Sequence, residues 1–359
     1  MCLARCQQKN YAGWHQQPAL RARSSQSSGR KVDPPYIWGT LDVGSKWSSF
    51  RAAESSSGLG LPFNLFVSVA APGTIRLSFS DSPMFATDHG MAAEVAVNVL
   101  KDGPVHDFLQ PAVLALLEEA LPEMPRSPDL PYTYGGEYRR FLARTLHYGE
   151  ESGHGGAVVV VRDCAVEELK NLVTIKYQTS GHVLWEDMKH YLRAVFEEIN
   201  LGHDVKSDKQ SVSRAIHDSW RQALNRRDNA ERVLADRSRF LARLMQVDGA
   251  LILTDRLRVL GFGAVVTDLG GEPQPVWRCS DARGTSLAPF SVSSHGTRHR
   301  AAISLASQSD CVAFVLSQDG GVKAITRRGN DILVWPAVAL DPSSWFITAD
   351  DLLRSYASH

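Results

Sequence analysis

The C-terminal half of the chain alternates short apolar runs with longer stretches of helical periodicity. Residues 152–163, SGHGGAVVVVRD, pass from a glycine-rich turn into an uninterrupted apolar run, which predicts a fully buried strand. From 184 to 202, apolar residues at every fourth position predict an amphipathic helix that stops near Gly202. The charged stretch 211–246 predicts a long helix that packs on a domain or on a dimer partner. Together these elements indicate an α/β fold with a mixed sheet flanked by helices.

Further strands are predicted where apolar or alternating runs are bounded by turn residues, as in VDGALILTD, RVLGFGAVVTD and CVAFVLSQ. Upstream, FNLFVSVA and TIRLSFS predict a hairpin with APG as its turn. We divide the chain into four parts by composition and pattern: a disordered, basic, Ser- and Gln-rich tail at 1–55, an N-terminal α/β module with an HGG turn at 56–205, a second α/β domain at 206–345, and a C-terminal helix at 346–359.

Charge and cysteine usage narrow the function classes. The 359 residues contain 39 Lys+Arg and 39 Asp+Glu, so any basic site must be local, and neither a nucleic-acid nor a membrane partner is expected. Up to Lys31 there are six basic residues and no acid, which fits a disordered tail or a misassigned start better than a nucleic-acid-binding arm. The five scattered cysteines lack a CxxC pair, and no apolar run is long enough for a membrane span. We expect a cytoplasmic protein.

A basic motif, Gly296-Thr297-Arg298-His299-Arg300, stands where the last predicted helix begins. Cations are usually favoured at helix C-termini, so at a helix start they add to positive charge and suit an anion such as phosphate. Arg298 and Arg300 offer bidentate donors for phosphate oxygens. Thr297 can cap the helix, and His299 can orient a phosphate or bind a metal. A solvated basic turn is the alternative, but it needs neither Gly-Thr before it nor Ala-Ala behind it.

A second motif, Asp248-Gly249-Ala250, lies between a predicted helix end and a buried strand. Taken alone, Asp248 is explained as a former of the helix-to-strand turn, with Gly249 relieving crowding. The functional alternative is a carboxylate at a strand edge that holds a metal or accepts a proton from a hydroxyl. In that case Gly249 would let a base or a ribose approach the backbone.

The two motifs, 48 residues apart from Asp248 to Gly296, together resemble the diadenylate cyclase domain, in which DGA and GTRHR form one nucleotide site. In motif order and spacing, residues 205–340 look like the cyclase domain of the DNA integrity scanning protein family. Upstream, SGHGGAVVVV followed by IKY and an amphipathic helix resembles the N-terminal part of the DACNV sensor proteins, which are proposed to sense nucleotide signals in bacterial defence or stress systems.

The resemblance implies condensation of two ATP molecules to cyclic di-AMP with Mg²⁺ or Mn²⁺ as cofactor. Asp248 would lie by the ribose 3′-hydroxyl and bind the metal together with His299, while Gly249 and Ala250 would line the adenine and ribose pocket. Two such sites face each other in this family, so a homo-oligomer is expected. The remaining nucleotide contacts would come from the basic motif and the end of the next strand: Gly296, Thr297, Arg298, His299, Arg300, Ser317 and Gln318.

One departure from the family favours a different function. The scanning protein has further arginine after its Ser-Gln, whereas here Ser317-Gln318 is followed by Asp-Gly-Gly at 319–321. Arg327 or Arg328 on the next strand is the candidate replacement for the missing charge. The alternative function is a catalytically inactive sensor domain that binds a nucleotide second messenger, and the HGG turn, whose His154 could reach a ligand, favours it.

Overall fold

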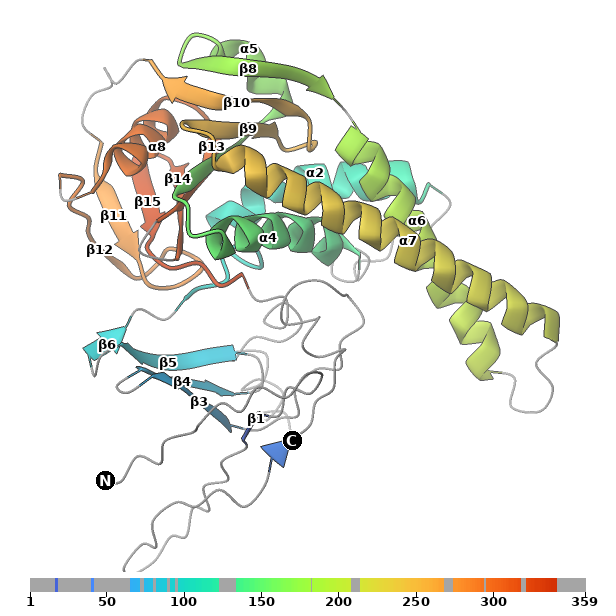
Figure 1. Ribbon diagram of the computed structural model, residues 1–359. Helices are drawn as coiled ribbons and strands as arrows, with labels where there is room; N and C mark the ends of the chain where they lie inside the picture. The colour runs from blue at the N-terminus through green and yellow to red at the C-terminus, as the bar shows by residue number, and fades with distance from the viewer. Residues whose placement is uncertain are drawn as a thin grey trace, which may run out of the picture. The chain divides into compact units, whose positions relative to one another are not determined.

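The computed structural model divides the chain into two compact units, Met1–Ala93 with Phe346–His359, and Glu94–Trp345 (Figure 1). Most of the predicted tail at 1–55 and the predicted helix at 346–359 lie outside the residues that the structure describes. The described residues are 17–18, 40–41, 65–71, 74–79, 82–88, 91–93, 96–122, 134–181, 183–207, 214–267, 274–293, 295–317 and 321–340.

The first unit contains a four-stranded antiparallel sheet in the order β3-β4-β5-β6. The predicted hairpin is confirmed, because Leu65 of β3 pairs with Phe79 of β4 in an antiparallel register. A further short pair, β1 with β2, belongs to the same unit. The strands are β1 (Gln17–Pro18), β2 (Thr40–Leu41), β3 (Leu65–Ala71), β4 (Thr74–Phe79), β5 (Ser82–Asp88) and β6 (Met91–Ala93).

The second unit is built on a nine-stranded sheet in the order β12-β11-β15-β14-β13-β7-β9-β10-β8. Two neighbouring pairs, β7 with β9 and β11 with β15, are parallel, and the other pairs are antiparallel. The sheet is therefore mixed, as predicted. Its strands are β7 (Gly156–Val161), β8 (Val173–Gly181), β9 (Ala250–Thr254), β10 (Val259–Val266), β11 (Val276–Cys279), β12 (Leu287–Pro289), β13 (Cys311–Leu316), β14 (Val322–Arg328) and β15 (Asp331–Trp335).

Helices cover both faces of this sheet, which confirms the predicted α/β class. In β7, Val158 and Val160 join the core under α2, α4, α6 and α7, whereas Val159 and Val161 join the core under α8. This alternation explains why the strand is apolar at every position: neither of its faces meets water. The helices are α2 (Pro104–Ala120), α4 (Gly135–Glu151), α5 (Val166–Leu169), α6 (Val183–Ser207), α7 (Arg214–Met245) and α8 (Thr297–Gln308), with a 3₁₀ turn, η1 (Asp163–Ala165).

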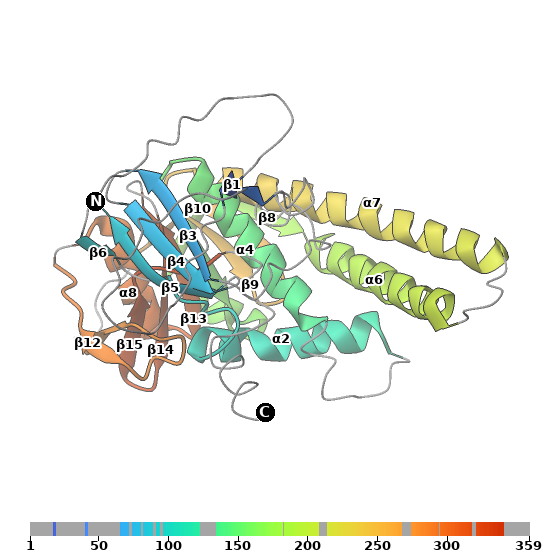
Figure 2. The ribbon, with the colours of Figure 1, turned by 90° about the horizontal axis from the view of Figure 1, so that it is seen from below.

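The two long helices α6 and α7 run side by side and extend beyond the sheet (Figures 1 and 2). The predicted stop at Gly202 is wrong, because α6 continues to Ser207. Gly202 instead lets α6 and α7 pack closely, because a Cβ at this position would lie 3.3 Å from Nε1 of Trp220 on α7. A glycine inside a helix lets a neighbouring ring approach closely, and the sequence pattern alone does not distinguish this use from a helix end.

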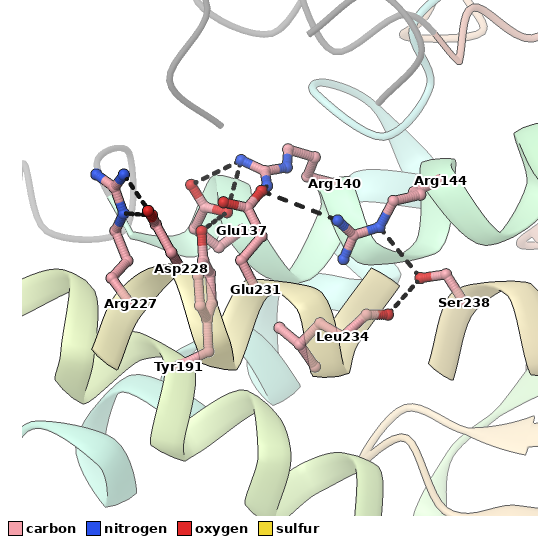
Figure 3. Close-up of polar contacts among 9 residues, drawn as sticks. All are labelled: Glu137, Arg140, Arg144, Tyr191, Arg227, Asp228, Glu231, Leu234 and Ser238. Atoms are coloured by element: carbon pink, nitrogen blue, oxygen red, sulfur yellow. Dashed lines mark hydrogen bonds and ion pairs between the residues drawn. The ribbon is translucent and has the colours of Figure 1, made fainter. Parts of the chain in front are cut away.

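A buried charge network joins α7 to α4 (Figure 3). Arg140 of α4 makes ion pairs with Glu231 of α7 and with Glu137, whose carboxylate also accepts a hydrogen bond from the hydroxyl of Tyr191 on α6. Nε of Arg144 donates to the hydroxyl of Ser238 at 3.2 Å. Because these groups are buried, removing one partner would leave a charge without compensation. The network thus locks α7 against the body of the unit.

The predicted boundary between modules at 205/206 does not separate two domains. It falls inside α6, in the last turn of that helix, and within the compact unit Glu94–Trp345. Strand β7 of the predicted N-terminal module lies between β13 and β9 of the predicted second domain. An apolar run indicates that a strand is buried, but it does not indicate which strands cover its two edges.

No helix in the described part of the chain is long and apolar enough to cross a membrane.

Candidate functional site

The sheet topology brings the two sequence motifs to one edge. Strands β7 and β9 are parallel, so both begin at this edge, and Asp248 lies two residues before the start of β9. Strand β13 is antiparallel to β7, with Leu316 opposite Gly156, so it ends there and β14 starts there. Helix α8 turns into β13 through only Ser309 and Asp310, so its first turn, which carries the basic motif, lies over the same edge.

An ion pair between Arg298 and Asp248 joins the two motifs. Nη2 of Arg298 lies 3.6 Å from Oδ1 of Asp248. The Asp248 side chain is fully exposed and the Arg298 side chain is partly exposed, so this ion pair is screened by water and separates readily. The structure thus brings together an exposed carboxylate and a guanidinium that lie 50 residues apart in the sequence.

Gly249 is required by the sheet itself. Its φ is +109°, and a Cβ at this position would lie 2.7 Å from the carbonyl oxygen of Ala264 on β10. The close backbone approach expected for a ligand is therefore made by β10, and relief of crowding is the explanation that the geometry supports. Ala250 begins β9, pairs with Ala264 and packs against the core under α8.

Helix α8 begins at Thr297, with Gly296 as its N-cap residue. The expected cap by Thr297 is not formed, because Thr297 is already the first helical residue, and no side chain in the described residues caps this helix. The carbonyl oxygen of Gly296 accepts hydrogen bonds from the backbone N–H groups of His299 and Arg300. Thr297 and Arg300 are exposed. The positive end of the helix dipole therefore faces the edge without a carboxylate or hydroxyl cap.

His299 is half-buried, whereas the next residue, Arg300, is exposed. Burial, together with the charges of Lys323 and His295, lowers the pKa of His299 to about 4, so the ring is neutral near pH 7. The ring of His295 packs edge-on against it with centroids 5.3 Å apart. Nε2 of His299 and Nε of Arg298 are buried without a hydrogen-bond partner in the described part of the chain. Such atoms call for a further partner, such as a bound anion or water.

The turn after β13 is tied to helix α4. The backbone N–H of Ser317 donates to the carbonyl oxygen of Gly321, and the Gly321 N–H donates to Oε1 of Glu150 at 3.0 Å. Ser317 is therefore held at the site edge. Gln318, Asp319 and Gly320 lie outside the described residues.

The expected replacement of the missing charge by Arg327 or Arg328 is wrong. Nη1 of Arg327 donates to the carbonyl oxygen of Ser307, in the last turn of α8, and Nη1 of Arg328 donates to the carbonyl oxygen of Arg283. Both arginines stand at the far end of β14, away from the first turn of α8. The basic residue at the near end is Lys323, which sequence reasoning missed; its signal was a single charge between the apolar positions of VKAI.

The HGG turn lies at the same edge, where β7 begins. A Cβ on Gly156 would lie 2.6 Å from the carbonyl oxygen of Met245, the last residue of α7. This glycine therefore lets the end of α7, and with it Asp248, approach β7 closely. His154 is exposed.

The residues fit a divalent metal only in part. Mg²⁺ is usually held by one or two carboxylates together with phosphate oxygens and water, and the exposed Asp248 can supply one such carboxylate. His299 fits poorly, because the Lys323 ammonium beside it repels a cation. Among the described residues, no three His, Cys, Asp or Glu side chains form a metal-binding group.

The sequence matches no family model, and a search of curated proteins finds no match either. The resemblance to diadenylate cyclases is therefore a hypothesis carried by the motifs and by their positions in the fold.

Proposed function

We propose that this protein binds an adenine nucleotide through its phosphates at the edge formed by the start of α8 and the start of β9. One observation carries the proposal: Arg298 of the basic motif lies 3.6 Å from Asp248 of the second motif. Arg298, Arg300 and the uncapped helix start supply positive charge, and the unpartnered nitrogens of Arg298 and His299 supply hydrogen-bonding capacity.

The activity we propose for the site is diadenylate cyclisation. The 3′-hydroxyl oxygen of one ATP attacks the α-phosphorus of a second ATP, the bond from that phosphorus to the pyrophosphate oxygen breaks, and pyrophosphate leaves. Asp248 takes up the hydroxyl proton and passes it to solvent. A second such step closes the ring, so two ATP give one cyclic di-AMP and two pyrophosphates. The basic motif contributes by positioning the phosphates and neutralising their charge.

This reaction needs two sites that face each other, and we therefore propose a homo-oligomer as the active form. A divalent ion bound through Asp248 would add positive charge against the phosphates. Asp248 would first have to separate from Arg298, and a phosphate group that takes the guanidinium makes this exchange favourable.

A sensor that binds a nucleotide without turnover is the second candidate. It is favoured by the pairing of Asp248 with a cation and by the lack of a metal-binding group among the described residues. Strand β7 and its HGG turn belong to the same sheet edge, so a ligand bound there would contact the part of the chain that resembles the sensor proteins.

The two functions are separated by incubating the purified full chain with ATP and Mn²⁺ and measuring cyclic di-AMP by mass spectrometry, with ATP binding measured by calorimetry. Asp248→Asn should abolish product formation, and Arg298→Ala should abolish binding. The control is Arg256→Ala, which removes an exposed arginine at the opposite end of the β9–β10 hairpin, where it pairs with Glu119.

Product from the parent but not from Asp248→Asn supports the cyclase. Saturable binding without product supports the sensor. If Arg298→Ala binds ATP as tightly as Arg256→Ala does, the basic motif is not the site and the proposed function fails.

A further inference from the structure

Strand register places Lys323 beneath the first turn of α8. Lys323 pairs with Val315 of β13, and Val315 belongs to the core under α8. The neighbours of Lys323 on β14, Val322 and Ala324, belong to the core on the other face of the sheet. Since successive side chains of a strand point to opposite faces, Lys323 projects toward α8.

The position of Lys323 along α8 follows from that of Arg327, which lies four residues further along β14 on the same face of the strand. Arg327 reaches the carbonyl oxygen of Ser307 in the last turn of α8. Four strand residues span ~13 Å at about 3.3 Å per residue. The helix rise from Ser307 back to His299 is ~12 Å at 1.5 Å per residue. Lys323 therefore lies under His299, and its charge is one of the causes that lower the pKa of that ring.

We propose that Lys323 binds a phosphate group of the same polyphosphate ligand that Arg298 binds. This inference rests on the proposed function and names a further binding residue of that site. Lys323, on the sheet beneath α8, would supply the positive charge that the Asp-Gly-Gly sequence at 319–321 lacks.

Burial makes this lysine suited to the role. Its side chain is half-buried beside apolar Val315, and a lysine in such a place keeps its ammonium at the polar rim, which here is the site edge. A phosphate at this edge would contact Lys323 and Arg298 from two different elements, β14 and α8, which would orient the ligand.

The test compares Lys323→Gln with Lys170→Gln in the full chain. Lys170 is an exposed lysine that pairs with Glu167 on α5, far along the chain from either motif. Binding of ATP, inorganic triphosphate and adenosine is measured by calorimetry. We expect Lys323→Gln to weaken ATP and triphosphate binding about 10- to 100-fold, the effect of losing one charge-assisted hydrogen bond. Adenosine binding should not change, and Lys170→Gln should bind like the parent.

Lys323→Arg keeps the charge and is the second variant, because the glutamine could disturb packing under α8. Recovery of triphosphate binding by arginine to within about fivefold of the parent supports a charge contact, since both side chains carry one positive charge. If Lys323→Gln binds triphosphate as the parent does while Arg298→Ala does not, Lys323 lies outside the site and only this inference fails. If the parent binds neither ATP nor triphosphate, the proposed function fails with it.

Discussion

Replacing Gly249 by alanine should destabilise the fold more than it disturbs any ligand. The backbone at this position has φ +109°, and the new Cβ would lie within 2.8 Å of three backbone atoms of Gly263 and Ala264. A non-glycine residue in such a region costs roughly 1–3 kcal/mol. Overpacking against atoms that cannot rotate away adds roughly 1–3 kcal/mol. We expect a total loss of about 2–6 kcal/mol, or roughly 4–24 °C in the unfolding temperature for a domain of this size.

Gly296→Ala is the matched control for this prediction. Gly296 has φ −66°, and a Cβ there meets no atom within 4 Å, so the change should cost at most about 1 kcal/mol through the weaker N-cap. Both variants are followed by urea unfolding with circular dichroism detection. If Gly249→Ala unfolds within about 1 kcal/mol of the parent, β10 does not require this glycine, and the structural reasoning is refuted.

Three further outcomes are expected. Glu231→Ala leaves the guanidinium of Arg140 buried without this partner and should cost about 3–5 kcal/mol in urea unfolding; a loss below about 1 kcal/mol would show that water reaches the network. Tyr138→Phe removes a buried hydrogen bond of 2.6 Å to the carbonyl oxygen of Asp255 and should cost about 1–3 kcal/mol by the same measurement, with an unchanged midpoint as the contrary result. The pKa of His299 is lowered from 6.5 to about 4, so the contribution of this residue to folding stability is present above pH 6.5 and is lost as the pH falls from 6.5 toward 4. His299→Gln should therefore flatten the dependence of the unfolding free energy on pH in this range. An NMR titration of the His299 ring with a midpoint near 6.5 would contradict the prediction.

The sequence predicted the elements of the second unit well because their patterns are local. The apolar run 157–161, the long charged helix and the strands around both motifs all occur close to their predicted positions. The pairing of strands was not predictable in the same way. β7 pairs with β9 and β13, which are about 90 and 150 residues away, and nothing in a strand's own residues identifies such distant partners.

In the candidate site, too, local features were predictable from the sequence and long-range contacts were not. The proximity of Asp248 to Arg298 followed from motif spacing only through the resemblance, and the sheet topology supplies its physical cause. Two assignments failed for different reasons. Thr297 does not cap its helix because the helix already begins at this residue, and Arg327 contacts the last turn of α8 because the strand register places it there. Lys323 was missed because only the strand register reveals which face a lone lysine occupies.

The central position of β7 has a consequence for how the chain is made. The ribosome completes β7 at Val161, but its neighbour β13 is complete only at Leu316, roughly 150 residues or about 8–30 s later at ~5–20 residues per second. Until β9 is complete at Thr254, both edges of this strand of four consecutive valines lack their partners, and the edge that pairs with β13 lacks its partner until Leu316. A valine-rich strand without proline and with an open edge is the kind of segment that aggregates. We therefore expect chains truncated before Leu316 to aggregate more readily than the finished chain, in which β13 covers this edge of β7.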